Sequence, residues 1–129
     1  MPKQPFNPPG LPAAIGPYSW ATRHGNLVFL AGTGSIGADG KLIGAGDIRK
    51  QTEVTLENLK VAVTAAGGSL ADIVKTTVYL GDVADYAGMN EVYHRYFPDA
   101  PPARATLITG FVVPGLLVEI EAIAALDQS

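Results

Sequence analysis

The sequence predicts an α+β fold, in which one β-sheet carries two helices on a single face. The main observation is the order of the hydrophobic patterns, which is strand, strand, helix, strand, helix, strand, strand. A second observation concerns the other face. Several strand-like runs are apolar on both sides, such as LVFLA at residues 27–31, although a sheet covered on one face should alternate. We therefore expect the uncovered face to be buried against copies of the same chain.

Length and composition exclude several classes of protein. The 129 residues suffice for one domain with a real core, which we place over residues 1–129. Hydrophobic residues make up 47% and charged residues 16%, which argues against disorder. No apolar run approaches the roughly 20 residues of a membrane helix, and the N-terminus lacks an apolar signal core. The net charge of −3 argues against nucleic acid as the main partner.

The absence of cysteine bears on both location and chemistry. Without cysteine the chain has no disulfides, no thiolate nucleophile and no cysteine-based zinc site. This composition is typical of a cytoplasmic protein, which is the location we expect.

The N-terminal third is expected to form a leader and a hairpin. Residues 1–12 are rich in proline and predict an extended leader with few hydrogen bonds. Residues 16–22, GPYSWAT, indicate a short strand that pairs with residues 27–31 through a turn at Gly25-Asn26. The glycines of residues 32–40, GTGSIGADG, indicate a long turn. We reject a phosphate-binding loop there, because no Lys-Ser or Lys-Thr follows and no helix opens directly after it.

Two helices with a strand between them are expected next. Asp47 is a candidate N-cap for a helix that runs to about Ala66, where Gly67-Gly68 stops it. Residues 69–72 have the spacing of a capping box and predict a single helical turn. The β-rich run at 73–80, IVKTTVYL, predicts a strand. A second helix, capped by Asp82 or Asp85, then reaches Phe97, before the prolines at 98, 101 and 102.

The last two strands carry the charges of greatest interest. Residues 103–125 read as two apolar strands joined by a loop, with Arg104 at the head of the first and Glu119 and Glu121 inside the second. Residues two apart share a face of a strand, so both glutamates point the same way. Pattern alone permits a half-buried strand with its charges in water. The functional interpretation is a cleft in which Arg104 holds an anion and a glutamate manages a proton or a water.

Other chemistries find little support. The spacing of His24 and His94 matches no metal-ligand motif, and no serine lies in a nucleophile-elbow pattern. The aromatic residues of the second half are expected in the core or at an interface: Tyr79, Tyr86, Tyr93, Tyr96 and Phe97. Arg104, a glutamate and Tyr18 therefore remain as the candidates for chemistry.

Five short motifs carry a resemblance to a known family: AIGPYS around Tyr18, AAGG followed by DIVKTTVYL, NEVY, PARA and VEIEAIA. Their order and spacing are specific, notably the PAR motif followed 15 positions after its arginine by EIE. From Ala14 to Leu126 the chain resembles the YjgF/reactive intermediate deaminase (Rid) family. The resemblance implies a chorismate-mutase-like fold and a homotrimer with three clefts where subunits meet.

The resemblance also implies an activity. Members that keep this arginine are typically hydrolases that convert 2-imino and 2-enamino acids, such as 2-aminoacrylate, 2-iminobutanoate and 2-iminopropanoate, to 2-oxo acids and ammonia without a cofactor or metal. By motif match, Arg104 binds the substrate carboxylate and Glu119 orients or activates water. Tyr18 completes the catalytic set. The family lines its pocket at the positions of Gly32, Asn90 and Thr106.

Three departures from the family pattern leave the substrate open. Residues 31–33 are Ala-Gly-Thr where Ser-Gly-Gln is frequent, Trp20 replaces a common glutamine, and Thr106 replaces the cysteine of some members. Two alternatives stand beside the deaminase. One is a non-catalytic ligand-binding or regulatory trimer, and the other is a deaminase of another enamine, such as an aminomuconate-type compound.

Overall fold

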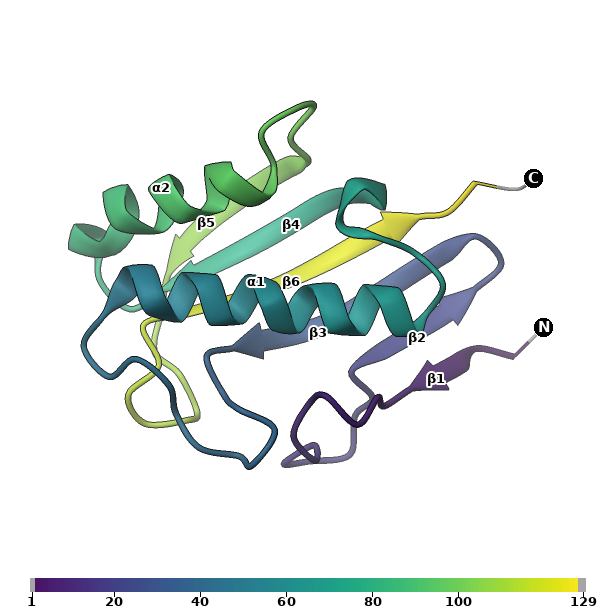
Figure 1. The fold of residues 1–129 in the computed structure, drawn as a ribbon, viewed down its shortest axis with the longest axis horizontal. Coiled ribbons are helices and arrows are strands. Elements are labelled where there is room, and N and C mark those ends of the chain that lie inside the picture. The colour runs from purple at the N-terminus through teal and green to yellow at the C-terminus, as the bar shows by residue number, and fades with distance from the viewer. Residues whose placement is uncertain (1, 128–129) are drawn as a thin grey trace.

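The computed structural model describes residues 2–127, whose strands all belong to one mixed sheet (Figure 1). The six strands are β1 (Gln4–Phe6), β2 (Ala21–His24), β3 (Leu27–Gly34), β4 (Ile73–Leu80), β5 (Ala103–Ile108) and β6 (Val118–Ala125). The helices are α1 (Ile48–Ala65) and α2 (Tyr86–Tyr96), with 3₁₀ turns η1 (Leu70–Asp72) and η2 (Val83–Asp85).

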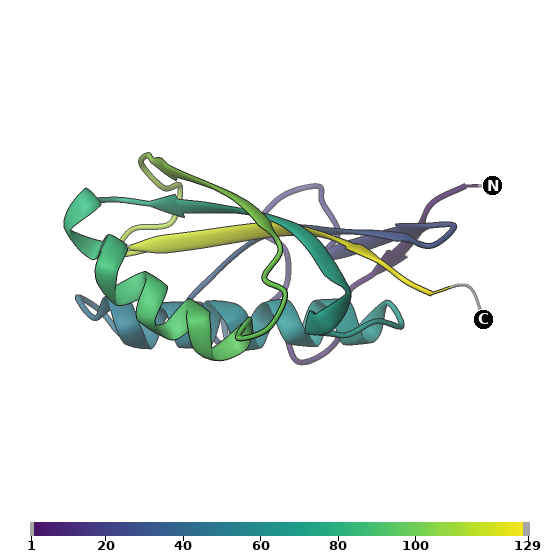
Figure 2. The ribbon, with the colours of Figure 1, turned by 90° about the horizontal axis from the view of Figure 1, so that it is seen from above.

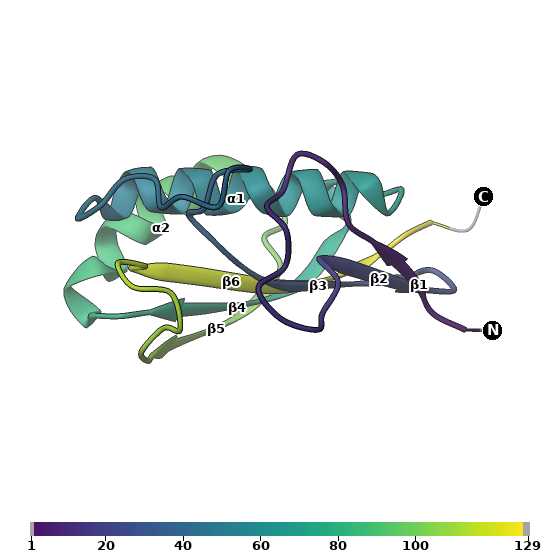
Figure 3. The same ribbon diagram turned by 90° about the horizontal axis from the view of Figure 1, so that it is seen from below.

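Both helices pack on the same face of the sheet, as the two edge-on views show (Figures 2 and 3). This arrangement confirms the predicted fold class of a sheet with two helices on one face. Neither helix within residues 2–127 combines the length and the apolar character needed to cross a membrane.

The strand order determines which charges can meet. The sheet runs β1-β2-β3-β6-β4-β5, with β4 and β5 parallel and every other pair antiparallel. The two charged C-terminal strands are therefore not neighbours, because β4 lies between β5 and β6. Although β5 and β6 follow one another in the chain, the loop between them is long enough to carry β6 past β4.

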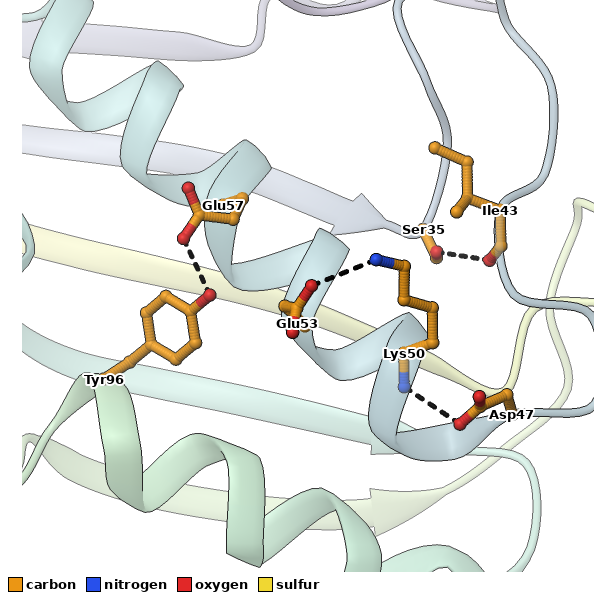
Figure 4. Close-up of polar contacts among 7 residues, drawn as sticks. All are labelled: Ser35, Ile43, Asp47, Lys50, Glu53, Glu57 and Tyr96. Atoms are coloured by element: carbon orange, nitrogen blue, oxygen red, sulfur yellow. Dashed lines mark hydrogen bonds and ion pairs between the residues drawn. The ribbon is translucent and has the colours of Figure 1, made fainter.

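Local sequence signals account for the start and end of α1. The Asp47 side chain accepts a hydrogen bond from the Lys50 backbone N–H at 3.0 Å, and Lys50 also pairs with Glu53 at 3.1 Å (Figure 4). The chain leaves the helix through Gly67 at φ +97°, a conformation that glycine adopts without strain. The predicted helix, with its N-cap and its glycine stop, is thus confirmed.

The second helix begins one turn later than its first acidic candidate cap. The Asp82 side chain accepts from the Ala84 N–H at 2.8 Å and caps η2, while Asp85 makes no side-chain cap bond. On the neighbouring face, the Tyr96 hydroxyl donates to Glu57 of α1 at 2.7 Å (Figure 4). This bond ties α2 to α1 above the sheet.

The core lies between the helices and the sheet. On β6 the predicted apolar row is buried against α1, whereas Glu119 and Glu121 alternate with it and are only half-buried. The opposite face exposes apolar side chains on three strands: Leu27 and Phe29 of β3, Leu107 of β5 and the half-buried Ile123 of β6. The apolar row and the apolar uncovered face both match the expected pattern.

Two N-terminal expectations are wrong. The leader contains β1, whose Phe6 lies opposite Ala21 of β2, so it is paired rather than unbonded. The strand expected at residues 16–22 begins only at Ala21, because Gly16 and Tyr18 form a tight turn in which the Tyr18 N–H donates to the Gly16 carbonyl at 2.9 Å. Strand β3 also extends to Gly34, three residues beyond its predicted end.

Candidate functional site

Arg104 lies on the helix-covered face, against two tyrosines of α2. Its register partner on β4 is Thr76, which is buried beneath α2. The guanidinium carbon lies 4.8 Å from the ring centre of Tyr93 and 5.7 Å from that of Tyr86, within the range of cation–π attraction. The Arg104 Nη2 also donates to the Tyr86 hydroxyl at 3.1 Å. We call Arg104, Tyr86, Asn90 and Tyr93 the Arg104 cluster.

The Arg104 cluster leaves the guanidinium able to bind an anion. Within residues 2–127 Arg104 makes no ion pair, so no carboxylate of these residues neutralises its charge. A pocket of about 450 Å³ opens beside it, lined by Asn90, Tyr93, His94, Phe97, Pro98, Pro101, Pro102 and Arg104. The planar donor fork of an arginine in such a place suits a carboxylate.

Glu119 lies on the uncovered face, in a different pocket. Its register partners are Gly34 on β3 and Tyr79 on β4. A pocket of about 600 Å³ surrounds it, and most of the lining is apolar: Pro12, Ala13, Ile15, Gly16, Tyr18, Trp20, Ala31, Gly32, Gly34, Ile36, Gly40, Val112, Val113, Leu116 and Glu119. We call this the Glu119 pocket. Tyr18 and Gly32 line it together with Glu119.

A β-bulge shapes the wall of the Glu119 pocket. The register of β3 and β6 shifts between Leu30 and Thr33, so Ala31 and Gly32 together occupy the place opposite Glu121. The missing side chain of Gly32 leaves room for the carboxylate, because a Cβ at that position would lie 3.0 Å from Glu119 Oε2. Any larger residue at Gly32 must therefore displace the Glu119 carboxylate.

The two glutamates of β6 have different surroundings. Burial, followed by the negative charge of Glu121, raises the pKa of Glu119. Within the described chain no donor binds the Glu119 carboxylate, whereas Glu121 accepts a hydrogen bond from the Tyr79 hydroxyl at 2.6 Å. The contact with Glu121 raises the pKa of Tyr79 in turn. Glu119 is thus the carboxylate that remains available for proton transfer.

A buried amide holds the loop that enters β6. Gln51 of α1 is fully buried, and its Nε2 donates to the carbonyls of Gly44 and Gly115 at 3.1 and 3.0 Å. Its Oε1 accepts from the Leu117 N–H at 2.8 Å. Gln51 therefore sets the position of the backbone two residues before Glu119. Composition and pattern gave no sign of this role, because one glutamine in a helix predicts only a polar surface position.

The structure places the predicted site residues in two groups rather than one. Asn90 lines the pocket beside Arg104. Thr106 lies two residues after Arg104, on the same face of β5. Tyr18 and Gly32 lie with Glu119 on the other face. Arg104 and Glu119 do not share a cleft within one chain, because Arg104 faces α2 whereas Glu119 lies on the uncovered face of the sheet.

Two further features complete the description of the site. Tyr86, which was expected in the core or at an interface, is 42% exposed in the single chain and contacts Arg104. A tyrosine at the start of a helix gives no signal of such a contact.

No group of three or more potential metal-ligating side chains occurs in the part of the chain that the structure describes.

Comparisons with known proteins identify the family of the chain. The model of the family described as Endoribonuclease L-PSP matches residues 10–126. A RutC family protein of Pyrococcus horikoshii is 48% identical over 113 residues, which are 88% of this chain and 90% of that protein. The 3-aminoacrylate deaminase RutC of Acinetobacter baylyi is 38% identical over 124 residues, with 96% and 98% coverage.

A solved structure extends the likeness to three dimensions. The crystal structure of RidA from the Antarctic bacterium Psychrobacter sp. PAMC 21119 superposes with a TM-score of 0.89 at 36% identity, covering 95% of this chain and 99% of that one. The chain therefore belongs to the YjgF/Rid family, as the sequence predicted. Relatives of this family include named deaminases.

Proposed function

We propose that the chain is a hydrolase that deaminates 2-imino and 2-enamino acids, such as 2-aminoacrylate, to 2-oxo acids and ammonia without a cofactor. The observation that carries the proposal is that neither Arg104 nor Glu119 forms an ion pair within the described residues. Arg104 offers a donor fork for a carboxylate, and Glu119 offers a carboxylate of raised pKa in an apolar pocket. Family membership points to the same chemistry.

In the proposed reaction Arg104 binds the substrate and Glu119 transfers two protons in turn. An enamine such as 2-aminoacrylate enters as its imine tautomer, which forms when one proton moves from the nitrogen to the terminal carbon. Arg104 binds the carboxylate of the imino acid and holds its C=N carbon in place. Glu119 takes a proton from water as the water oxygen bonds to that carbon, and gives a proton to the nitrogen. Glu119 next takes the proton of the new hydroxyl and gives it to the amine nitrogen. The C–N bond then breaks, ammonia leaves and a C=O bond forms, so that imine and water become 2-oxo acid and ammonia. The raised pKa brings Glu119 closer to neutral pH, where one group can both accept and return the proton.

The proposal requires a second copy of the chain. Arg104 and Glu119 lie on opposite faces of one sheet, so a single chain cannot bring both to one substrate. The uncovered face, with Phe29 and Leu107 close to half exposed, supplies apolar surface for association. We propose a homotrimer in which Arg104 of one copy and Glu119 of the next copy share a cleft.

Ammonia release from 2-aminoacrylate generated in the cuvette tests the activity. Light scattering at micromolar concentration should give about three chains per particle, in keeping with closed symmetric assembly. A stable monomer would contradict the shared cleft. Binding of pyruvate without any ammonia release would instead favour the ligand-binding or regulatory alternative.

A mixing experiment tests whether the cleft is shared. Arg104→Ala and Glu119→Gln chains are each expected to be almost inactive, and they are co-refolded in equal amounts. About one cleft in four would then receive an intact Arg104 from one copy and an intact Glu119 from the next, so that about a quarter of the wild-type activity returns. If no activity returns from assembled mixed trimers, both groups do not act in one shared cleft.

A further inference from the structure

Tyr86 differs from the other tyrosine of the Arg104 cluster in what its hydroxyl can do. Tyr93 is buried, its hydroxyl lies 2.7 Å from the buried Thr76 hydroxyl, and its ring packs against the Arg104 guanidinium. The Tyr86 side chain is 42% exposed. Its oxygen accepts a hydrogen bond from Arg104 Nη2 at 3.1 Å. Because a guanidinium can only donate, the Tyr86 proton is not used in this bond.

The surroundings make that proton a good donor. A hydroxyl whose oxygen accepts from a cation becomes polarised and donates more strongly to an anion. The interaction with Asn90, one turn later on α2, and then the positive charge of Arg104 lower the pKa of Tyr86. The phenol therefore stands beside the guanidinium with its O–H directed away from the bond to Arg104.

We propose that Tyr86 is a second carboxylate-binding residue, whose O–H donates to the carboxylate that Arg104 holds. The proposal rests on the proposed function, since it assigns a donor for the substrate of that same site. It limits the substrate class further, because a ligand must present a carboxylate with one oxygen free for the phenol. It also separates the two aromatic neighbours of Arg104: Tyr93 supports the cation by its ring, and Tyr86 contacts the ligand.

The substitution Tyr86→Phe tests this, because it removes the hydroxyl and keeps the ring near Arg104. We expect the dissociation constant of pyruvate, measured by titration calorimetry, to rise about tenfold, in keeping with the loss of one hydrogen bond to a charged group. With 2-aminoacrylate, KM should rise while kcat changes by less than about twofold, because the lost contact is made equally before and during reaction. The melting temperature should stay unchanged, since the hydroxyl is exposed.

Tyr96→Phe is the matched control. It makes the same change on the same helix and removes the hydrogen bond from the Tyr96 hydroxyl to Glu57 of α1 (Figure 4). This variant should bind pyruvate as the wild type does. A further ligand, the neutral amide pyruvamide, should lose less affinity than pyruvate in Tyr86→Phe, because its amide oxygen accepts a weaker hydrogen bond from the phenol than a carboxylate does.

Each outcome decides one question. Unchanged pyruvate affinity in Tyr86→Phe, or equal weakening in Tyr86→Phe and Tyr96→Phe, overturns the assignment of Tyr86. Selective weakening in Tyr86→Phe supports it. Should the wild type bind pyruvate with this Tyr86 dependence and yet release no ammonia, the carboxylate site stands and the proposed deaminase fails. Should the wild type turn over substrate while Tyr86→Phe matches it in every constant, only the role of Tyr86 fails.

Discussion

The Arg104 cluster and the Glu119 pocket are built from different materials. Side chains hold Arg104: two tyrosine rings pack on the guanidinium, and the Tyr86 hydroxyl accepts from it. Backbone features shape the pocket of Glu119, namely the bulge at Ala31-Gly32 and the loop that Gln51 fixes at Gly115 and Leu117. One charge is held by direct contacts, while the other lies beside a space that the backbone leaves open.

This difference suits the two proposed tasks. A residue that binds a carboxylate has to keep one geometry. Several contacts already fix the Arg104 side chain in the free protein, so it loses less rotamer freedom when the ligand binds. A proton-transferring group needs a shifted pKa and freedom to reach both water and the leaving nitrogen. Within residues 2–127 the Glu119 carboxylate accepts no hydrogen bond, and burial together with Glu121 raises its pKa. We therefore expect substitutions in the cluster to change affinity and those in the pocket to change rate.

The largest effect is expected for Glu119→Gln. The amide keeps the shape and removes the proton chemistry, so the rate with 2-aminoacrylate formed in situ should fall roughly 10²-fold. Pyruvate should bind with similar affinity, because the carboxylate clamp lies elsewhere. Glu121→Gln is the matched control on the same strand and face, and it should reduce turnover much less, since Glu121 already bonds to Tyr79.

Reversal of this pair would break the comparison. If Glu121→Gln is the inactive enzyme and Glu119→Gln the active one, the assignment of the two glutamates is reversed. If both variants turn over substrate as the wild type does, neither glutamate carries the proton transfer.

The next largest effect is expected for substitutions of Arg104, in the Arg104 cluster. Arg104→Lys keeps the charge but loses the two-pronged geometry, and a charge-assisted hydrogen bond contributes about 1.5–3 kcal/mol. We expect kcat/KM to fall by at least about tenfold and pyruvate affinity to fall with it, in contrast to Glu119→Gln. Arg104→Ala should be worse while the oligomer, checked by light scattering, stays intact. If Arg104→Ala deaminates 2-iminopropanoate at the wild-type rate, Arg104 does not bind the substrate carboxylate as proposed.

A smaller effect is expected for Gly32→Ala, which adds a side-chain atom beside the Glu119 carboxylate. In Gly32→Ala the new Cβ would lie 3.0 Å from Glu119 Oε2 and 3.2 Å from Cδ, so the carboxylate must move by a few tenths of an ångström. We expect kcat to fall about fivefold, since a misplacement of 1 Å costs up to 10²-fold. Gly110→Ala is the control, because no heavy atom lies within 4 Å of its added Cβ. Equal rates in both variants would show that the space beside Gly32 is not needed.

Local signals in the sequence predicted much of the fold. The Asp47 cap, the helical stripe and the glycine stop are short-range features, and α1 follows them. Alternation along β6 correctly placed Glu119 and Glu121 on one face. Strand β1 escaped prediction because it is short and contains Pro5, and a proline usually argues against a strand unless it lies at a sheet edge.

The site was harder to predict because it depends on pairing between distant strands. Alternation tells which residues of one strand share a face, but not how that face is turned relative to another strand. Arg104 and Glu119 were expected in one cleft, yet β5 pairs with β4 and carries Arg104 toward α2. The motif match selected both residues and implied clefts where subunits meet, whereas the strand pattern did not indicate that Arg104 and Glu119 lie on opposite faces of the sheet.

The smallest effect we predict is a shift in pH dependence that separates the two causes of the raised pKa of Glu119. As a base Glu119 must be ionised, so kcat/KM should rise with pH as Glu119 loses its proton, and the midpoint should lie above the ordinary value of 4.5. Burial is the larger cause and Glu121 the smaller. Glu121→Gln removes only the second cause and keeps an oxygen for Tyr79, so the midpoint should move to lower pH and still remain above 4.5. The pH profiles of the two proteins, measured at low substrate concentration, check this. A midpoint that stays in place or moves to higher pH would mean that Glu121 does not act on the group that controls the reaction.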